Sequence, residues 1–206
     1  MHKVLDFIKK NKQFSFFLLL VILLALITIF APVIAPQDPY VSDLKNALQP
    51  PSSAHWFGTD KLGRDIFSRV IYASRSSLPA TLILVVLIFA IGTLLGTLAG
   101  YFGGWIDAVI MRISDMMISF PGMVLAIAVA GIMGASVKNA VIAVAVVSWP
   151  KYARLARSLV MKIRHEDYIY AAIVTGSKTS YILRKYMLPN IIPTLIITAA
   201  TDIGGM

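Results

Sequence analysis

The chain contains no cysteine, and charged residues make up only 14% of its 206 positions. The absence of cysteine excludes disulfides, thiolate metal ligands and a thiol nucleophile. Soluble domains carry about 25% charged residues, whereas 58% of this chain is hydrophobic. The composition therefore indicates a membrane protein.

Side chains suited to catalysis or metal binding are also scarce. The three histidines, His2, His55 and His165, are far apart, and none has a metal-ligand partner at helical spacing. No G-x-S-x-G elbow and no carboxylate pair for acid–base work is apparent, so we predict no catalytic residue, no metal site, no cofactor bound by this chain and no enzymatic activity. Asp115 and Asp202 are the acids near or within apolar runs, where an acid is a functional candidate. For Asp202, a position near a helix end facing protein or water explains the residue equally well.

The net charge of +9 is concentrated in two blocks. Residues 151–190 hold eight Lys or Arg against Glu166 and Asp167. Basic blocks beside apolar runs are typical of the cytoplasmic side of a membrane protein, so we expect contact with lipid, a cytoplasmic N-terminus and no nucleic-acid partner. The N-terminal block sets four lysines against Asp6, namely Lys3, Lys9, Lys10 and Lys12.

The apolar runs predict an all-α polytopic membrane protein. Residues 14–35 would span ~33 Å as a helix, which is enough to cross a bilayer. This run is longer than the apolar part of a signal peptide and lacks a good cleavage site, so we expect it to be retained. The expected spans are 14–35, 78–102, 116–137, 138–155 and the beginning of a fifth, 191–206. We expect the remaining segments to be a cytoplasmic tail (1–13), an extracytoplasmic loop with an amphipathic segment (36–77) and a cytoplasmic loop (156–190). The core of the permease is expected to be 78–206.

Three glycines recur at every fourth position of the second expected span: Gly92, Gly96 and Gly100. Lipid gives no hydrophobic drive between helices, so close backbone contact through small residues favours their association. We therefore predict that this stripe is a helix-packing face.

Two stretches imitate a phosphate-binding loop without completing it. After Gly58 and Gly63, where lysine and a hydroxyl are needed, the sequence has Arg64 and Asp65, and an aspartate repels phosphate. In the second stretch, "AAIVTGSKTS", serine stands before Lys178 where the loop requires glycine. We therefore do not expect this chain to bind a nucleotide.

The same second stretch lies within a longer spaced pattern. The inner-membrane permeases of binding-protein-dependent ABC importers share a cytoplasmic signature, E-A-A, three residues, G, nine residues, I, one residue, L-P, and this chain keeps that spacing with Tyr170 in place of Glu and Tyr186 in place of Ile. Blocks such as "EDYIYAA", "GTLAGYFGGWIDAVIMRISDMMISFP" and "SWPKYARLARS" resemble the C-type permease of the dipeptide/oligopeptide/nickel branch, which often lacks that glutamate. The resemblance covers nearly the whole chain.

The resemblance carries several expectations. It implies a core of about six spans in a bacterial cytoplasmic membrane, the last one or two incomplete here. It implies a homologous second permease, two ATPase subunits that bind ATP and Mg, and an extracytoplasmic solute-binding protein. In the family the signature loop forms two short helices that dock on the ATPase, and this role falls on Asp167, Tyr170, Ala171, Ala172, Gly176, Tyr186, Leu188 and Pro189. We expect the alanines to allow close approach, Gly176 to make a sharp turn, and Leu188-Pro189 to stop the chain before it re-enters the membrane.

The function that the resemblance implies is a subunit of an ATP-driven importer, forming half of the pathway for peptides, nickel or a metal chelate. Two other classes remain open. A secondary transporter driven by an ion gradient would favour embedded charges or broken helices in repeated halves. A membrane scaffold without transport activity would account for the spans but not for the spaced loop.

Overall fold

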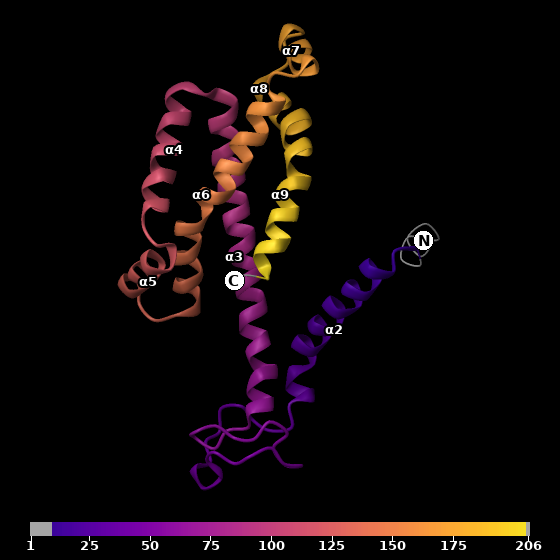
Figure 1. The fold of residues 1–206 in the computed structure, drawn as a ribbon, viewed down its shortest axis with the longest axis vertical. Coiled ribbons are helices and arrows are strands. Elements are labelled where there is room, and N and C mark those ends of the chain that lie inside the picture. The colour runs from indigo at the N-terminus through magenta and orange to yellow at the C-terminus, as the bar shows by residue number, and fades with distance from the viewer. Residues whose placement is uncertain (1–9, 205–206) are drawn as a thin grey trace. The chain divides into compact units, whose positions relative to one another are not determined.

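A computed structural model describes residues 10–204 and shows a helical chain (Figure 1). Within these residues the only β pairing is an isolated bridge between Thr59 and Asp65, so the all-α prediction is confirmed. The chain divides into two compact units, residues 1–79 and 80–206. Residues 1–9 of the predicted basic tail and the last two residues lie outside the described part.

The first unit begins with helix α2 (Lys12–Ile34), which is 23 residues long. Its side chains are apolar nearly all round, and Ala31 is its buried residue. A helix that is apolar on every face without a protein covering suits a lipid environment. This helix corresponds to the first predicted span.

The loop that follows α2 is held by hydrogen bonds to Asp65. The Asp65 carboxylate accepts bonds from the Ser68 backbone N–H (2.8 Å) and hydroxyl (2.7 Å), and lies 3.1 Å from His55 Nδ1. Burial raises the pKa of Asp65, but the hydrogen bonds from Ser68 and His55 outweigh it, so the pKa lies below its usual range. The bond to Ser68 also caps the start of helix α3 (Ile66–Phe102). A short 3-10 helix, η1 (Leu44–Asn46), lies within this loop.

The glycines of the stretch "GTDKLGRD" serve the geometry of this loop. Gly58 and Gly63 both have φ +74°, and a Cβ on Gly63 would overlap the Asp43 carbonyl. Between them, Asp60 accepts a 2.8 Å bond from Arg64 Nε. This bond to Arg64 lowers the pKa of Asp60 to about 2. The spacing that imitates a nucleotide loop is therefore that of a closed turn.

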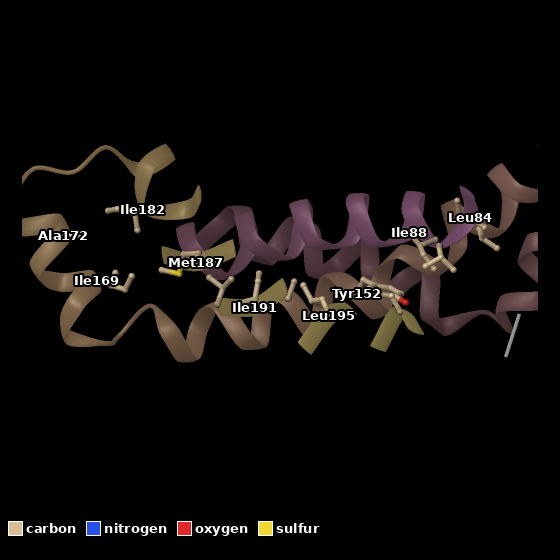
Figure 2. Close-up of a cluster of buried hydrophobic side chains, with 14 residues drawn as sticks. Leu84, Ile88, Tyr152, Ile169, Ala172, Ile182, Met187, Ile191 and Leu195 are labelled. Carbon is tan, nitrogen blue, oxygen red and sulfur yellow. The ribbon is translucent and has the colours of Figure 1, made fainter. Parts of the chain in front are cut away.

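The second unit is built around helix α6. It packs against α4, α5 and α9, and its Tyr152 lies in a buried cluster with Ile88 of α3 and Leu195 of α9 (Figure 2). The helices of this unit, besides the end of α3, are α4 (Gly104–Ser119), α5 (Gly122–Met133), α6 (Val137–Ile163), α7 (Asp167–Val174), α8 (Thr179–Ile182), the π-helical segment η2 (Leu183–Met187) and α9 (Leu188–Ile203).

The three spaced glycines of α3 all face α6. A Cβ on Gly92 would overlap Tyr152, a Cβ on Gly96 would overlap the Ala153 carbonyl, and a Cβ on Gly100 would lie 2.8 Å from the Arg157 carbonyl oxygen. Only glycine permits this approach of the two backbones along two helical turns.

Ion pairs also join α6 to α4. Arg157 forms a two-pronged contact with Asp107 through Nε and Nη2, and Arg154 Nη2 lies 2.5 Å from Asp115 Oδ1. The acid that the sequence singles out near an apolar run, Asp115, is thus the partner of an arginine on the neighbouring helix.

Within the described residues 10–204, three helical runs are long and apolar enough to cross a membrane: Lys12–Ile34, Ile66–Phe102 and Thr179–Ile203. The bent pair α4–α5 would make a fourth if it were counted as one span. The predicted span 116–137 is therefore not one helix, because the chain breaks at Phe120 and Pro121 and turns by 94°. The predicted span 138–155 lies within α6, which runs on to Ile163. The amphipathic segment assigned to the loop is continuous with the second span, since α3 begins at Ile66.

Candidate functional site

The signature loop begins with helix α7. Glu166 precedes it and Asp167 lies in its first turn, where an acidic side chain stabilises the helix dipole. Ile169 and Ala172 of α7 are buried. Of the two alanines predicted to allow close approach, Ala172 packs inside this unit, whereas Ala171 is exposed.

A C-terminal cap of the Schellman type ends α7 at Gly176. The Ser177 N–H donates to the Ala172 carbonyl and the Gly176 N–H donates to the Ile173 carbonyl, both at 3.0 Å. Gly176 has φ +79°, a conformation that glycine adopts without strain. Among residues 10–204, apart from Gly176 and its two chain neighbours, no heavy atom lies within 4 Å of the position of a Cβ on Gly176. The glycine is required here by the turn and not by a contact within the chain.

One face of α7 exposes Tyr170, which the sequence singled out, together with two apolar side chains, Ile173 and Val174, that it did not. Tyr170, Ile173 and Val174 are 49%, 48% and 85% exposed. We call these three residues the α7 face. Their spacing of three and four places them on one side of the helix, away from Ile169 and Ala172. Sorting the loop by helical periodicity would have found them.

The second half of the loop packs back onto α7. Ile182 of α8 and Met187 of η2 join the buried cluster that contains Ile169 and Ala172 (Figure 2). The ring of Tyr186, also predicted as a loop residue, lies between those of Tyr168 and Tyr181, with centroids 6.1 and 6.0 Å apart. The two short helices are thereby held as one packed elbow.

Leu188 and Pro189 do not stop the chain, contrary to the prediction. They open α9, which follows η2 in a helical run that starts at Thr179. Proline is tolerated in the first turn of a helix, because its missing N–H leaves no hydrogen bond unmade there. The run into the predicted fifth span is therefore continuous.

Beside the elbow lies an open basic hollow of about 880 Å³. Its side chains carry three positive charges and two serine hydroxyls, with the Lys185 ammonium 2.6 Å from the Tyr181 hydroxyl. Such a surface suits an acidic partner. The lining residues are Ser177, Lys178, Ser180, Tyr181, Arg184, Lys185 and Pro189.

The other acid singled out from the sequence, Asp202, lies near the end of α9 and contacts α6. Its carboxylate accepts hydrogen bonds from Lys151 Nζ at 2.5 Å and from the Tyr152 hydroxyl at 2.9 Å. Of the histidines, His55 contacts Asp65 in the first unit and His165 Nδ1 is hydrogen-bonded to the Tyr170 hydroxyl. His2 lies outside the described residues.

The spaced loop, the helical fold and the apolar spans agree with what comparisons show. Residues 92–206 match the family of binding-protein-dependent transport system inner membrane components, and residues 2–51 match the N-terminal TM domain of oligopeptide transport permease C. The chain belongs to the binding-protein-dependent inner membrane component family, whose members are transport subunits of the bacterial inner membrane.

Individual relatives are named for the transport of different solutes. The chain is 45% identical to a probable D,D-dipeptide transport system permease protein of Escherichia coli, over 90% of this chain and 62% of that protein. It is 43% identical to a dipeptide transport system permease protein of Alkalihalophilus pseudofirmus, over 96% and 65%. It is 37% identical to a nickel transport system permease protein of Escherichia coli, over 92% and 68%. The chain thus spans somewhat under two thirds of the length of the first two relatives.

Proposed function

We propose that this chain acts as the membrane-embedded permease subunit of an ATP-driven importer. In this proposal it pairs with a homologous permease to form the pathway, two ATPase subunits bind ATP and Mg, and an extracytoplasmic protein delivers the solute. The chain itself carries no catalytic group. ATP binding and hydrolysis shift the permease between two states, and the loop 156–190 transmits that shift.

The observation that carries this proposal is the α7 face. Apolar side chains on a short helix outside the spans are expensive to leave in water, so they favour a protein partner. The packed elbow behind the face, with Ile169, Ala172 and Met187 buried, lets a push on α7 move the elbow as one body. The basic hollow alongside adds charge complementarity to an acidic partner.

A glutamate in the α7 face tests the proposal. Val174→Glu places a charge at a side chain that is 85% exposed, so the fold of this chain tolerates it while an apolar contact does not. We expect loss of co-purification of the ATPase subunits with the tagged permease, and loss of ATP-dependent uptake. Leu44→Glu, at an exposed leucine of η1 in the first unit, is the matched control and should leave both unchanged.

Two results would contradict the proposal. Co-purification and uptake equal to wild type in Val174→Glu would remove the α7 face as the docking surface. Uptake that persists after deletion of the ATPase subunits would favour a secondary transporter instead.

The relatives that are named for dipeptide and nickel transport support a solute within that range. We propose a short peptide as the solute class, because a cavity of the second unit is lined by one positive and one negative side chain, Lys151 and Asp202.

A further inference from the structure

A cavity of about 340 Å³ lies between α4, α6, α9 and the second-unit part of α3. Its walls combine apolar side chains such as Ile88 and Val147 with a compact charged group, Lys151, Tyr152 and Asp202. Sites for small molecules are of this size and have this make-up, a mainly apolar lining with a few convergent polar groups. The Tyr152 side chain, with its oxygen in red, lies among the labelled residues of Figure 2.

The charged group presents both signs of charge to the cavity. The Asp202 side chain is 16% exposed and the Lys151 side chain is 60% exposed. Asp202 accepts from both Lys151 and the Tyr152 hydroxyl, so the carboxylate is satisfied while the ammonium keeps donors free for a ligand. An ionisable residue at the end of a membrane span is a functional candidate, and here it lines a cavity with its own counter-charge.

We propose that this cavity contacts the transported solute, and that the solute class carries one ammonium and one carboxylate, as a short peptide does. Asp202 receives the ammonium and Lys151 receives the carboxylate. The inference rests on the proposed transport function and adds the chemistry of the solute to it.

The exchange of partners explains why such a site suits transport. Without solute the two charges neutralise each other. With solute each exchanges its internal partner for one on the ligand, so the net gain is small and binding is weak. A pathway needs sites that are favourable enough to enter and weak enough to leave.

The same geometry disfavours a bare divalent cation at this place. One carboxylate paired with an ammonium offers a metal a single ligand and a neighbouring positive charge. Among residues 10–204, no group of three or more His, Cys, Asp or Glu side chains is placed to hold a metal ion. Both observations favour a zwitterion as the ligand of this cavity.

The test uses the complete importer, purified in detergent without its binding protein. Binding of alanyl-alanine, N-acetyl-alanyl-alanine and alanyl-alaninamide is measured by saturation-transfer NMR at millimolar concentrations. In wild type, alanyl-alanine should bind about tenfold more tightly than either blocked peptide, because each blocked peptide loses one charged hydrogen bond.

Two variants assign the ends. Asp202→Asn should weaken alanyl-alanine about tenfold relative to the N-acetyl peptide, and Lys151→Gln should weaken alanyl-alanine about tenfold relative to the amide. The control is the neighbouring pair between α6 and α4: Arg154→Gln and Asp115→Asn break an ion pair of equal length, 2.5 Å, at residues outside the cavity lining. Both controls should bind all three peptides as wild type does.

Three results would overturn the inference: no binding of alanyl-alanine to wild type, equal binding of the three peptides, or unchanged binding in Lys151→Gln. If Asp202→Asn fails to fold, the Lys151→Gln comparison carries the test alone, since that side chain is 60% exposed. ATP-dependent uptake and ATPase association are measured in parallel. If they persist while the peptides bind alike, the transport function stands and the cavity assignment falls; if the ATPase subunits do not associate, the proposed function itself fails.

Discussion

Replacement of Gly176 by valine should separate ATP hydrolysis from transport. Gly176 sits at φ +79° with open space around its Cβ position, so the cost of a side chain is backbone strain and not a clash. A residue other than glycine in this region costs about 1–3 kcal/mol, and a β-branched residue lies at the upper end. At 1.4 kcal/mol per factor of ten, the population of the capped turn should fall about five- to hundredfold relative to alternative ends of α7.

The consequence is a misplaced elbow on an otherwise intact permease. The two hydrogen bonds of the cap, to the Ala172 and Ile173 carbonyls, would be lost, while the buried cluster of the second unit keeps its side chains. We expect normal amounts of protein in the membrane, retained ATP hydrolysis and a several-fold lower ratio of solute uptake to ATP hydrolysed. The assay is uptake and phosphate release from proteoliposomes that contain the full importer.

Two further variants define what would refute this reasoning. Gly176→Asn should keep most of the coupling, because asparagine tolerates the left-handed conformation. Gly131→Val of α5, a glycine without positive φ and with nothing within 4 Å of its Cβ position, should behave as wild type. Equal damage by Asn and Val, or wild-type coupling in Gly176→Val, would show that the backbone conformation at this turn is not what matters.

The remaining predictions concern stability. Gly96→Val should destabilise the solubilised protein by about 1–3 kcal/mol through overpacking, because a Cβ on Gly96 would overlap the Ala153 carbonyl. Its thermal midpoint should therefore fall by more than that of Gly131→Val. Equal midpoints in the two variants would contradict the tight α3–α6 contact. Arg157→Met should lower the free energy of unfolding by about 2 kcal/mol, which is less than the 3–5 kcal/mol of a fully buried pair. Arg154→Met should lower it by under about 1 kcal/mol, because the pair with Asp107 is less exposed than the pair with Asp115. Chemical denaturation measures both values, and the opposite order would contradict these pairings. In the folded loop of the first unit, the hydrogen bond to Arg64 lowers the pKa of Asp60 to about 2, below its ordinary range. The contribution of Asp60 is therefore present above about pH 4 and lost as the pH falls toward 2, so pepsin should cut this loop faster in that window; Asp60→Asn should already be cut at pH 4, and resistance of the variant would count against the Arg64 contact.

The sequence allowed the all-α class and the presence of several long apolar helices to be predicted, because these depend on local composition. The glycine stripe is also a local pattern. What the spacing could not tell is which way each side chain points: Ala172 occupies a signature position yet packs against its own unit, while Ile173 and Val174 next to it are exposed. A sequence motif gives the residue types at each position, whereas the direction in which each side chain points is determined by tertiary packing.

The predicted stop at Leu188-Pro189 is absent from the described residues, because these two residues open α9. Pro121 does coincide with a break between α4 and α5, but Pro189 lies in the first turn of α9 and Pro193 lies inside that helix. The effect of a proline depends on whether its missing N–H had a partner to lose. Whether the missing N–H had a partner depends on where the helix begins, and the sequence predicts the first residue of a helix only approximately.

The basic residues of α6 organise the second unit through ion pairs with its neighbours. Lys151, Arg154 and Arg157 follow one another at intervals of three residues and pair with Asp202, Asp115 and Asp107. Each partner lies about 40 to 50 residues away in the chain, so no local pattern could reveal it. Paired in this way, the basic residues cost far less in a membrane than their count suggests.

This arrangement also connects the loop to the cavity. From Lys151 to the end of α6 at Ile163 the chain is one continuous helix of ~18 Å, and α7 follows three residues later. On the other side of the loop, the helical run from Thr179 ends near Asp202. The two segments that flank the signature loop are thus the two that hold the Lys151–Asp202 pair. A movement of the loop reaches this pair through two continuous helical runs, and this is the physical basis on which we expect the state of the ATPase to alter how tightly the cavity holds its solute.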